Sequence, residues 1–190
     1  MSQDPNPKSP QPTSFASRAG FKLDYALDEF GLDVSGQICA DLGCSTGGFT
    51  DCLLRRGATR IYSVDTGYGV LDWKLRNDPR VIVMERTNAL HLHLPEMLDF
   101  ISIDVSWTRQ KLILPKALTL LKPVGNIVSL VKPHYEAGIA HLTEQKSGEI
   151  FTEILQNLRQ INIIPNSSVK SPLVGEKGKN TEYLIWIHRP

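Results

Sequence analysis

Four charged side chains occur where the ends of strands and an amphipathic helix are expected. Asp104 and Lys132 each close a short apolar run, and Glu182 opens the last such run of the chain. Lys22 lies within the first amphipathic stretch. The carboxyl ends of neighbouring parallel strands meet at one edge of a sheet, and an antiparallel strand begins at that edge. We therefore expect Asp104, Lys132 and Glu182 to share one cleft, which Lys22 reaches if its helix packs near that edge.

Two lysines and two carboxylates in one cleft suit the deprotonation of a hydroxyl group. A lysine amine ordinarily titrates near about pH 10.4 and accepts a proton poorly until its pKa falls. A second ammonium and partial burial both lower that pKa. We predict Lys132 as the general base, assisted by Lys22. Asp104 and Glu182 are predicted to orient the amines, and Asp104 also to touch the charged end of a cofactor. Taken singly, each residue has an ordinary alternative, such as a cap, a solvent-reaching lysine or a charge on an edge strand.

The segment from Asp41 to Phe49 joins an apolar run to a predicted helix through a glycine-rich turn. Its spacing, D-x-G-x-x-x-G, differs from the G-x-G-x-x-G of dinucleotide-binding sites and from the phosphate-binding P-loop. An acid before the glycines would repel a pyrophosphate, whereas it suits the cationic sulfonium and the amino group of S-adenosylmethionine. The alternative is that these glycines only permit a tight turn.

Two further polar residues follow the next apolar runs along the chain. Asp65 ends the second run, where an acid can bond the hydroxyls of a ribose, and Asn88 follows the third run, where an amide can bond adenine. We predict S-adenosylmethionine as the cofactor and no metal. The residues predicted to bind the cofactor are Asp41, Gly43, Ser45, Gly47, Gly48, Phe49, Asp65, Asn88 and Asp104.

Strand and helix patterns alternate along the chain, which is typical of a doubly wound α/β sheet. Apolar runs predict strands at Ile38–Leu42, Ile61–Asp65, Val81–Met84, Phe100–Asp104, Asn126–Val131, Ile163–Lys170 and Glu182–His188. Periodic patterns predict one helix from a cap at Ser17 to about Phe30 and others at Gly48–Arg56, Leu71–Arg76, Gln110–Leu121 and Gly148–Gln160. No crossover helix fits between the last two strands, so the last should run antiparallel. The predicted fold class is α/β, a Rossmann-like methyltransferase with a seven-stranded, mostly parallel sheet and one antiparallel strand.

The composition is ordinary for a globular protein. With 190 residues and a formal net charge of +1, we expect one domain, in which any nucleic-acid surface is a local patch. Residues 1–14, rich in Pro and polar residues, are predicted to be a disordered tail before a domain at 15–190. The three cysteines lack metal-ligand spacing, and no run resembles a membrane span or a secretion signal, so a cytoplasmic location is expected.

Several motifs recur together in one known family. They are Ser17–Leu23, Ser45–Cys52, Val64–Asp65 with Gly67–Gly69, Glu85–Asn88, Ile103–Ser106 and Val131–Pro133. From residue 16 to the end, the chain resembles the TlyA (haemolysin A) family of FtsJ-like ribosomal RNA methyltransferases. The resemblance implies S-adenosylmethionine as the methyl donor, a ribose 2′-hydroxyl of rRNA or ribosomal subunits as the acceptor, and a Lys-Asp-Lys-Glu tetrad. That tetrad falls on Lys22, Asp104, Lys132 and Glu182.

Two features depart from that family. Its members usually carry an S4-type RNA-binding domain before the methyltransferase domain, where this sequence has segment 1–14, and residues 140–145 replace a glycine- and lysine-rich turn. RNA recognition is therefore expected to come from a partner protein or from a local basic surface. The residues considered for that surface are Arg109 and Lys111 beside Trp107, and Lys170, Lys177 and Lys179 in the last loop.

Other functions share parts of this pattern. A small-molecule methyltransferase would keep the cofactor loop without needing a second lysine, and a non-catalytic binding module would keep its role without Lys132. An NAD-linked oxidoreductase fits the fold, but the glycine spacing argues against it. A pore-forming toxin would need an amphipathic membrane hairpin, for which the sequence offers no pattern. The sequence therefore favours an enzyme that methylates RNA on the ribose 2′-hydroxyl.

Overall fold

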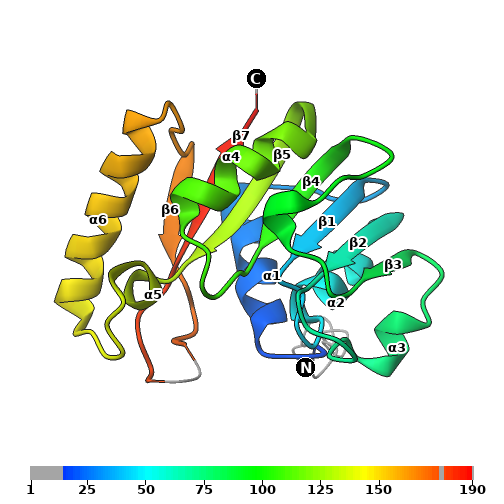
Figure 1. Ribbon diagram of the computed structural model, residues 1–190, viewed down its shortest axis with the longest axis horizontal. Coiled ribbons are helices and arrows are strands. Elements are labelled where there is room, and N and C mark those ends of the chain that lie inside the picture. The colour runs from blue at the N-terminus through cyan, green and yellow to red at the C-terminus, as the bar shows by residue number, and fades with distance from the viewer. Residues whose placement is uncertain (1–14, 176–177, 190) are drawn as a thin grey trace, which may run out of the picture.

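The computed structural model describes residues 15–175 and 178–189, and the predicted tail at 1–14 lies outside them. In this part of the chain, seven strands form one mixed sheet in the order β3-β2-β1-β4-β5-β7-β6 (Figure 1). The strands are β1 (Ile38–Leu42), β2 (Arg60–Val64), β3 (Val81–Met84), β4 (Leu98–Ile103), β5 (Leu121–Val131), β6 (Ser167–Lys170) and β7 (Tyr183–His188). The helices are α1 (Ala19–Phe30), α2 (Gly48–Arg55), α3 (Trp73–Arg76), α4 (Gln110–Leu120), α5 (Pro133–Ala137) and α6 (Glu144–Gln160), with a short 3-10 helix η1 (Ala89–His91).

The pairing of the strands confirms the predicted topology. Strands β1 to β5 pair in parallel, and β7 runs antiparallel to both of its neighbours, β5 and β6. The β6–β7 connection is too short for a crossover helix, which is why the last strand must reverse direction. The carboxyl ends of β1, β4 and β5 and the start of β7 therefore lie at the same edge of the sheet.

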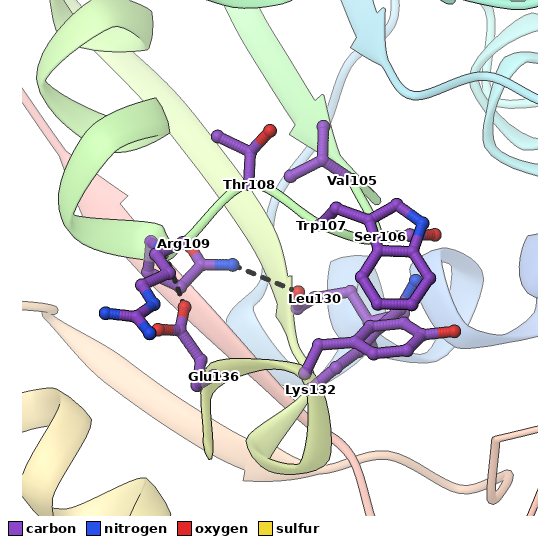
Figure 2. A pocket seen from close by; sticks show the side chains of 10 residues that line it. Val105, Ser106, Trp107, Thr108, Arg109, Leu130, Lys132 and Glu136 are labelled. Atoms are coloured by element: carbon purple, nitrogen blue, oxygen red, sulfur yellow. Dashed lines mark hydrogen bonds between the residues drawn. The ribbon is translucent and has the colours of Figure 1, made fainter. Parts of the chain in front are cut away.

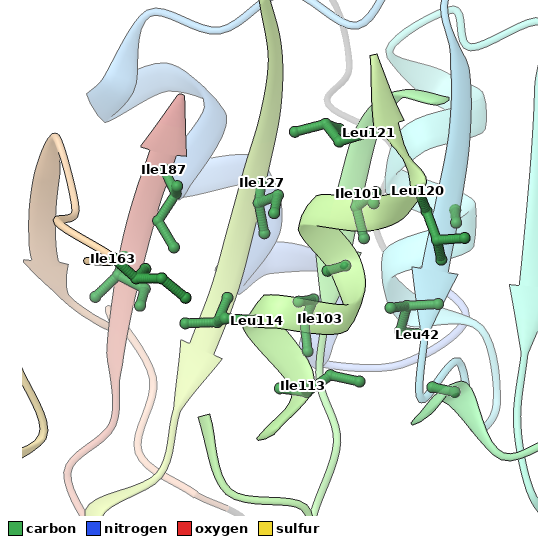
Figure 3. Close-up of a cluster of buried hydrophobic side chains, with 14 of the residues drawn as sticks. Leu42, Ile101, Ile103, Ile113, Leu114, Leu120, Leu121, Ile127, Ile163 and Ile187 are labelled. Carbon is green, nitrogen blue, oxygen red and sulfur yellow. The ribbon is translucent and has the colours of Figure 1, made fainter. Parts of the chain in front are cut away.

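Helices cover both faces of the sheet, as Figure 1 shows. Alternate side chains of each strand point to opposite faces, so in β1 Leu42 faces one cluster of buried side chains and Cys39 the other. Helices α4 and α6 pack on the first face, where isoleucines of the central strands contact Ile113 and Leu114 of α4 (Figure 3). Helices α1, α2 and α3 pack on the second face. This three-layer arrangement fixes both the sheet edge and α1, which are the parts that position the site.

Several element boundaries differ from the predictions. Ser17 does not cap α1 with its side chain: the cap position is Arg18, and the Ser17 carbonyl accepts from the Gly20 N–H. Strand β6 is limited to Ser167–Lys170, because Asn162 adopts a left-handed turn (φ +59°) after α6 and Ile163 packs into the core instead. These predictions were wrong because hydrophobicity alone does not distinguish a strand from an apolar turn that is buried.

Helices α3, α5 and α6 also depart from the predictions. Helix α3 is shortened to Trp73–Arg76, since the Asp72 side chain caps it by accepting from the Lys74 N–H. Helix α6 begins at Glu144, four residues earlier than predicted, behind a cap at Thr143. Helix α5 was not predicted at all. A proline in the first turn is a helix-start signal, and Pro133 supplies it directly after Lys132.

Within residues 15–175 and 178–189, no helix has the length and apolar character that crossing a membrane requires.

Candidate active site

A cleft of about 610 Å³ opens at the carboxyl edge of the central strands. Its walls come from the loop after β1, the loop after β4, the start of α5, the start of β7 and the first part of α1. The side chains and backbone that line it include Arg18, Lys22, Gly43, Ser45, Phe49, Asp104, Lys132, His134, Tyr135 and Glu182. All four residues of the predicted tetrad therefore border one cavity.

The register of the sheet explains why three of the four charges meet. In the β4–β5 pair, Ile103 is opposite Ser129, and Asp104 comes directly after β4. In the β5–β7 pair, Val131 is opposite Tyr183, so Lys132 just after β5 and Glu182 just before β7 are neighbours. The apolar strands stop at this edge, and their charged flanking residues project beyond the core.

Lys22 reaches the same cleft from a helix. It is the fourth residue of α1, whose apolar side packs on the sheet through Leu23 and Leu27, in the same buried cluster as Leu184 of β7. This packing holds the Lys22 side chain above the start of β7. Its Nζ atom donates a hydrogen bond to Oε2 of Glu182 at 2.5 Å, across 160 residues of sequence.

The four charges form two ion pairs. Lys22 pairs with Glu182, and Lys132 Nζ lies 2.5 Å from Oδ1 of Asp104. The side chains of the first pair are 10% and 3% exposed, and those of the second pair 12% and 18%. Buried charges of this kind are tolerated when they are paired, and removing one partner is strongly destabilising.

The pKa directions in the cleft correct one prediction. Burial acts to lower the pKa of Lys132, but the attraction of Asp104 and Glu182 outweighs it, and that pKa lies above its ordinary value. The prediction that the pKa of Lys132 is lowered is therefore wrong for the protein without a ligand. It considered burial and the ammonium of Lys22, but not how close the two carboxylates lie to Lys132. Burial also raises the pKa of Glu182, against the opposing effect of Lys22 and Lys132.

The loop between β1 and α2 approaches the loop after β4 through a glycine. Gly43 has φ +89°, and a Cβ atom at this position would lie 2.7 Å from the carbonyl oxygen of Asp104. Only glycine permits both the left-handed backbone and this close contact. Gly48, at the start of α2, likewise leaves space for Ser17, whose Oγ would lie 2.3 Å from an added Cβ. The two glycines bring the loop and the N-terminal segment against the cleft.

The sequence of the chain is similar to those of known methyltransferases. Residues 15–189 match the family model described as FtsJ-like methyltransferase. The 16S/23S rRNA (cytidine-2′-O)-methyltransferase TlyA of Mycobacterium tuberculosis is 37% identical over 186 residues, covering 92% of this chain and 68% of the relative. Hemolysin A of Brachyspira hyodysenteriae is 38% identical over 187 residues, covering 92% of this chain and 77% of the relative. The chain belongs to the FtsJ-like methyltransferase family, in its TlyA (haemolysin A) group.

Solved structures agree with this assignment. A Lactococcus lactis protein described as a candidate hemolysin superposes with a TM-score of 0.85 at 35% identity, covering 93% of this chain and 89% of that chain. The N-methyltransferase NodS of Bradyrhizobium japonicum, solved with S-adenosylhomocysteine, superposes with a TM-score of 0.65 at 15% identity, covering 94% and 90%. The second likeness shows the fold alone. The predicted family, methyltransferase activity and Rossmann-like fold are confirmed.

The residues predicted to bind the methyltransferase cofactor divide into two groups. Gly43, Ser45, Phe49 and Asp104 line the cleft. The others, Asp41, Gly47, Gly48, Asp65 and Asn88, are not among the residues that line it. Gly47 and Gly48 instead begin α2, where Gly47 is the cap residue. Their predicted contacts with a cofactor stay predictions.

The polar members of the second group already have partners within the chain. Asp41 is fully buried and accepts from the Thr50 hydroxyl at 2.7 Å, and burial raises its pKa to about 7. Asp65 accepts from the backbone N–H groups of Ser45 and Gly67, and the Asn88 side chain caps η1. Asp65 therefore fixes the shape of the cofactor loop through that loop's own backbone.

Among the cleft residues that sequence reasoning missed are His134 and Tyr135, which the unpredicted helix α5 brings in. Tyr135 lies beneath Lys132, whose Nζ is 5.5 Å from the ring centre, and next to Trp107, with 4.9 Å between ring centres. Figure 2 shows Trp107 and Lys132 on the same side of the small hollow formed by the loop after β4 and by α5. Glu136 holds that hollow together by accepting from the backbone N–H of Gln110.

The basic residues considered for RNA lie in two places. Arg109 and Lys111 border a hollow between α5 and α6, next to the Trp107 loop. Lys170, in contrast, makes an ion pair with Glu144 on the α6 side, and Lys177 lies outside the described residues. Lys179 is exposed in the last loop, which borders the cleft through Val174 and Gly175.

Proposed function

We propose that this chain transfers a methyl group from S-adenosylmethionine to a ribose 2′-hydroxyl of ribosomal RNA, with Lys132 as the general base. The observation that supports it most directly is that two lysine–carboxylate ion pairs, one buried and one partly buried, share one cleft beside a glycine-rich loop. Methylation of a hydroxyl needs a group that removes its proton as it attacks, and lysine amines in such a cleft are the groups suited to it.

The relatives support the acceptor. The TlyA protein of Mycobacterium tuberculosis is named for cytidine 2′-O-methylation of 16S and 23S rRNA. A more distant relative, the ribosomal RNA large subunit methyltransferase E of Acidiphilium cryptum, is 40% identical over 62 residues, covering 33% of this chain and 28% of the relative. We carry the common element of these names, a ribosomal RNA acceptor, over to this chain.

The cleft also fits the proposed cofactor, which supplies an electrophilic methyl group on a cationic sulfur. The fit rests on the donor set: the cleft places the carboxylate of Asp104 beside the open backbone of Gly43 and the buried ring of Phe49. The carboxylate of Asp104 would meet the positive end of the ligand, and Gly43, Phe49 and Ser45 would line the rest of it. Asp65 would act on it through the loop that its carboxylate shapes.

The tetrad assigns separate roles to its two ion pairs. Lys132 must give up its proton before it can take one from a hydroxyl, and its pairing with Asp104 opposes this. Any positive charge brought next to Asp104 weakens that pairing and lowers the pKa of Lys132. Lys22 stays paired with Glu182 and adds a second ammonium, so it disfavours the charged form of Lys132 and can stabilise an oxyanion.

The aromatic and basic side chains beside the cleft suit a single-stranded nucleotide. Trp107 is 85% exposed and is held at its position by contact with Tyr135. An exposed ring next to Arg109 and Lys111 can stack a base while the cations contact phosphates. This surface favours RNA over a small-molecule acceptor, which would need neither the exposed ring nor the basic approach. Recognition aided by an RNA-binding partner protein remains part of the proposal.

The test is transfer of labelled methyl from S-adenosylmethionine to ribosomal subunits and free rRNA, by the wild type and Lys132→Ala. We expect label on ribose, with the rate of the variant lower by about 10²- to 10⁴-fold, the usual contribution of a general base. Cofactor binding, measured by calorimetry, should persist in the variant. Lys116→Ala, a partly exposed lysine of α4 that does not line the cleft, is the matched control and should transfer at the wild-type rate.

Three outcomes would contradict the proposal. Normal turnover by Lys132→Ala would exclude the lysine-base mechanism. Cofactor binding by the wild type without label on any RNA would favour a small-molecule acceptor. If Lys132→Ala kept the full biological role of the wild type, a non-catalytic binding module would be favoured.

A further inference from the structure

His134 borders the cleft, and the chemistry proposed above does not use it. It is the second residue of α5, two positions after Lys132, and it lines the cavity together with Lys22 and Glu182. The residue is 6% exposed. Its Nδ1 atom is buried, and no group in the described part of the chain hydrogen-bonds it. A buried polar atom without a partner, in a residue that lines a cavity, marks that residue as one whose ring can contact a ligand.

Packing alone does not account for a histidine at this position. The ring contacts Tyr135, with 4.2 Å between ring centres, and an apolar ring would make that contact equally well. A buried nitrogen without a partner is costly, and native proteins keep few such atoms. The four tetrad residues of the cleft, in contrast, are paired with one another. His134 is thus a polar residue of the cleft whose requirement for a partner is not met within the described chain.

The surroundings of His134 keep its ring neutral. Burial lowers its pKa, and the neighbouring ammonium groups of Lys132 and Lys22 lower it further. The carboxylates that face the same cavity, Asp104 and Glu182, are each held by a lysine. A neutral imidazole has one N–H donor and one acceptor nitrogen, whereas an ammonium only donates and a carboxylate only accepts. The ring can therefore match either a donor or an acceptor on a bound ligand.

We propose that His134 hydrogen-bonds the acceptor nucleotide next to its reacting hydroxyl, and so holds that hydroxyl at Lys132. The inference rests on the proposed function, since it takes a ribonucleotide as the acceptor. The position of the residue supports it: His134 lies on the short helix that also carries Tyr135, so a nucleotide that contacts the aromatic pair would reach the imidazole and the amine together. His134 is a positioning residue in this scheme and exchanges no proton with Lys132.

The experiment compares four proteins in steady-state methyl transfer to ribosomal subunits and free rRNA. His134→Phe keeps a ring against Tyr135 but removes both nitrogens, and His134→Gln restores a donor and an acceptor without the ring. His93→Phe changes an exposed histidine that does not line the cleft and serves as the matched control. S-adenosylmethionine binding by each protein is measured by calorimetry.

We expect His134→Phe to lower kcat/KM for RNA by about 10- to 100-fold, mainly through KM, as for a lost hydrogen bond that leaves a partner unsatisfied. Its affinity for S-adenosylmethionine should equal that of the wild type, and His134→Gln should recover most of the loss. If His134→Phe no longer binds the cofactor, and so has misfolded, His134→Leu takes its place in the same comparison.

The outcomes separate the two proposals. An active wild type together with an unchanged kcat/KM in His134→Phe would overturn the role of His134 and leave the proposed function in place. A His134→Gln variant as defective as His134→Phe would also overturn it, because ring shape and not hydrogen bonding would then matter. If the wild type methylates no RNA, the proposed function fails first, and the role of His134 fails with it.

Discussion

The two halves of the sheet edge satisfy their polar side chains in different ways. On the cofactor side, around the ends of β1, β2 and β3, most partners are near in sequence: Asp41 bonds Thr50, nine residues away, and Asn88 bonds the backbone of Leu90. Ser102, 61 residues from Asp41, also donates to its carboxylate. On the acceptor side, after β4 and β5, the partners are distant. Lys22 and Glu182 are 160 residues apart, and they meet only because α1 and β7 are both in place.

This difference shows which parts of the site depend on the whole fold. Local hydrogen bonds on the cofactor side shape the loops, and they can persist when distant elements of the fold shift slightly. The ion pairs on the acceptor side bury Lys22 and Glu182 and partly bury Lys132 and Asp104, and a buried charge is tolerated only while its partner is present. The acceptor side should therefore be the sensitive half of the molecule, for stability as well as for catalysis.

The largest expected effect on stability comes from breaking the Lys22–Glu182 pair. Lys22→Met leaves the carboxylate of Glu182 buried without its cation, and we expect the free energy of unfolding to fall by about 3–5 kcal/mol. Urea denaturation at neutral pH measures this. Lys122→Met is the matched control, because Lys122 pairs with Asp99 at side chains that are 40% and 30% exposed, and should cost at most about 1 kcal/mol.

A double variant sharpens the comparison. Removing both charges in Lys22→Met/Glu182→Leu should recover most of the loss, since no lone buried charge remains. If Lys22→Met were as stable as Lys122→Met, the acceptor side would not be the sensitive half, and the contrast between the two regions would be wrong.

The sequence predicted where the tetrad residues lie in the fold better than it predicted which groups contact them. Apolar runs located the central strands, and the order of strands and helices required an antiparallel last strand, so Asp104, Lys132 and Glu182 were expected at one edge. The position of Lys22 in space could be inferred only from the family resemblance, because it depends on how α1 packs on the sheet. The pKa direction of Lys132 was wrong, since it depends on distances to carboxylates that no spacing in the sequence gives.

Asp41 shows a second limit of the sequence. A carboxylate just before a glycine-rich turn is predicted to bind the cofactor, and that contact stays a prediction, but the spacing did not reveal the partner that Asp41 has within the chain. Asp41 lies within β1, where alternate residues point to opposite faces. Its side chain points toward α2 and accepts from Thr50 beneath the loop. Helix α5 was missed for a simpler reason: five residues are too few for a periodic pattern, and Pro133 was its only signal.

The buried Asp41 should impose a pH dependence on the cofactor side. Its pKa is about 7 in the folded protein, against an ordinary value of 3.8. Between these values the folded state binds more protons than the unfolded state, so this contribution to stability is fully present below pH 3.8 and is lost as the pH rises through 7. Asp41→Asn should remove this slope, which is at most about 1.4 kcal/mol per pH unit.

Urea denaturation of the wild type and Asp41→Asn at several pH values between 5 and 8 tests this. The free energy of unfolding of Asp41→Asn should increase relative to that of the wild type as the pH rises. Asp99→Asn is the matched control: burial acts to raise the pKa of Asp99, but Lys122 and the Ile38 N–H hold it below its ordinary value. The Asp99 contribution is therefore lost only in acid, below pH 5. If the free energies of unfolding of the wild type and Asp41→Asn changed with pH in parallel, ionisation of the buried Asp41 would not destabilise the protein, and the prediction would be wrong.

The smallest expected effect concerns Asn88. It tests whether this residue of the cofactor side only stabilises its loop or also binds the cofactor. The Asn88 side chain caps η1 by accepting from the Leu90 N–H, so Asn88→Ala should cost about 1 kcal/mol of stability. Asn88→Ser keeps a capping oxygen but loses the amide, and should be nearly as stable as the wild type. If the amide also bonds adenine, both variants should bind S-adenosylmethionine about 2- to 10-fold more weakly by calorimetry. Wild-type affinity in Asn88→Ser would instead leave Asn88 as a cap alone, and the cofactor side at this position would then be purely local scaffold.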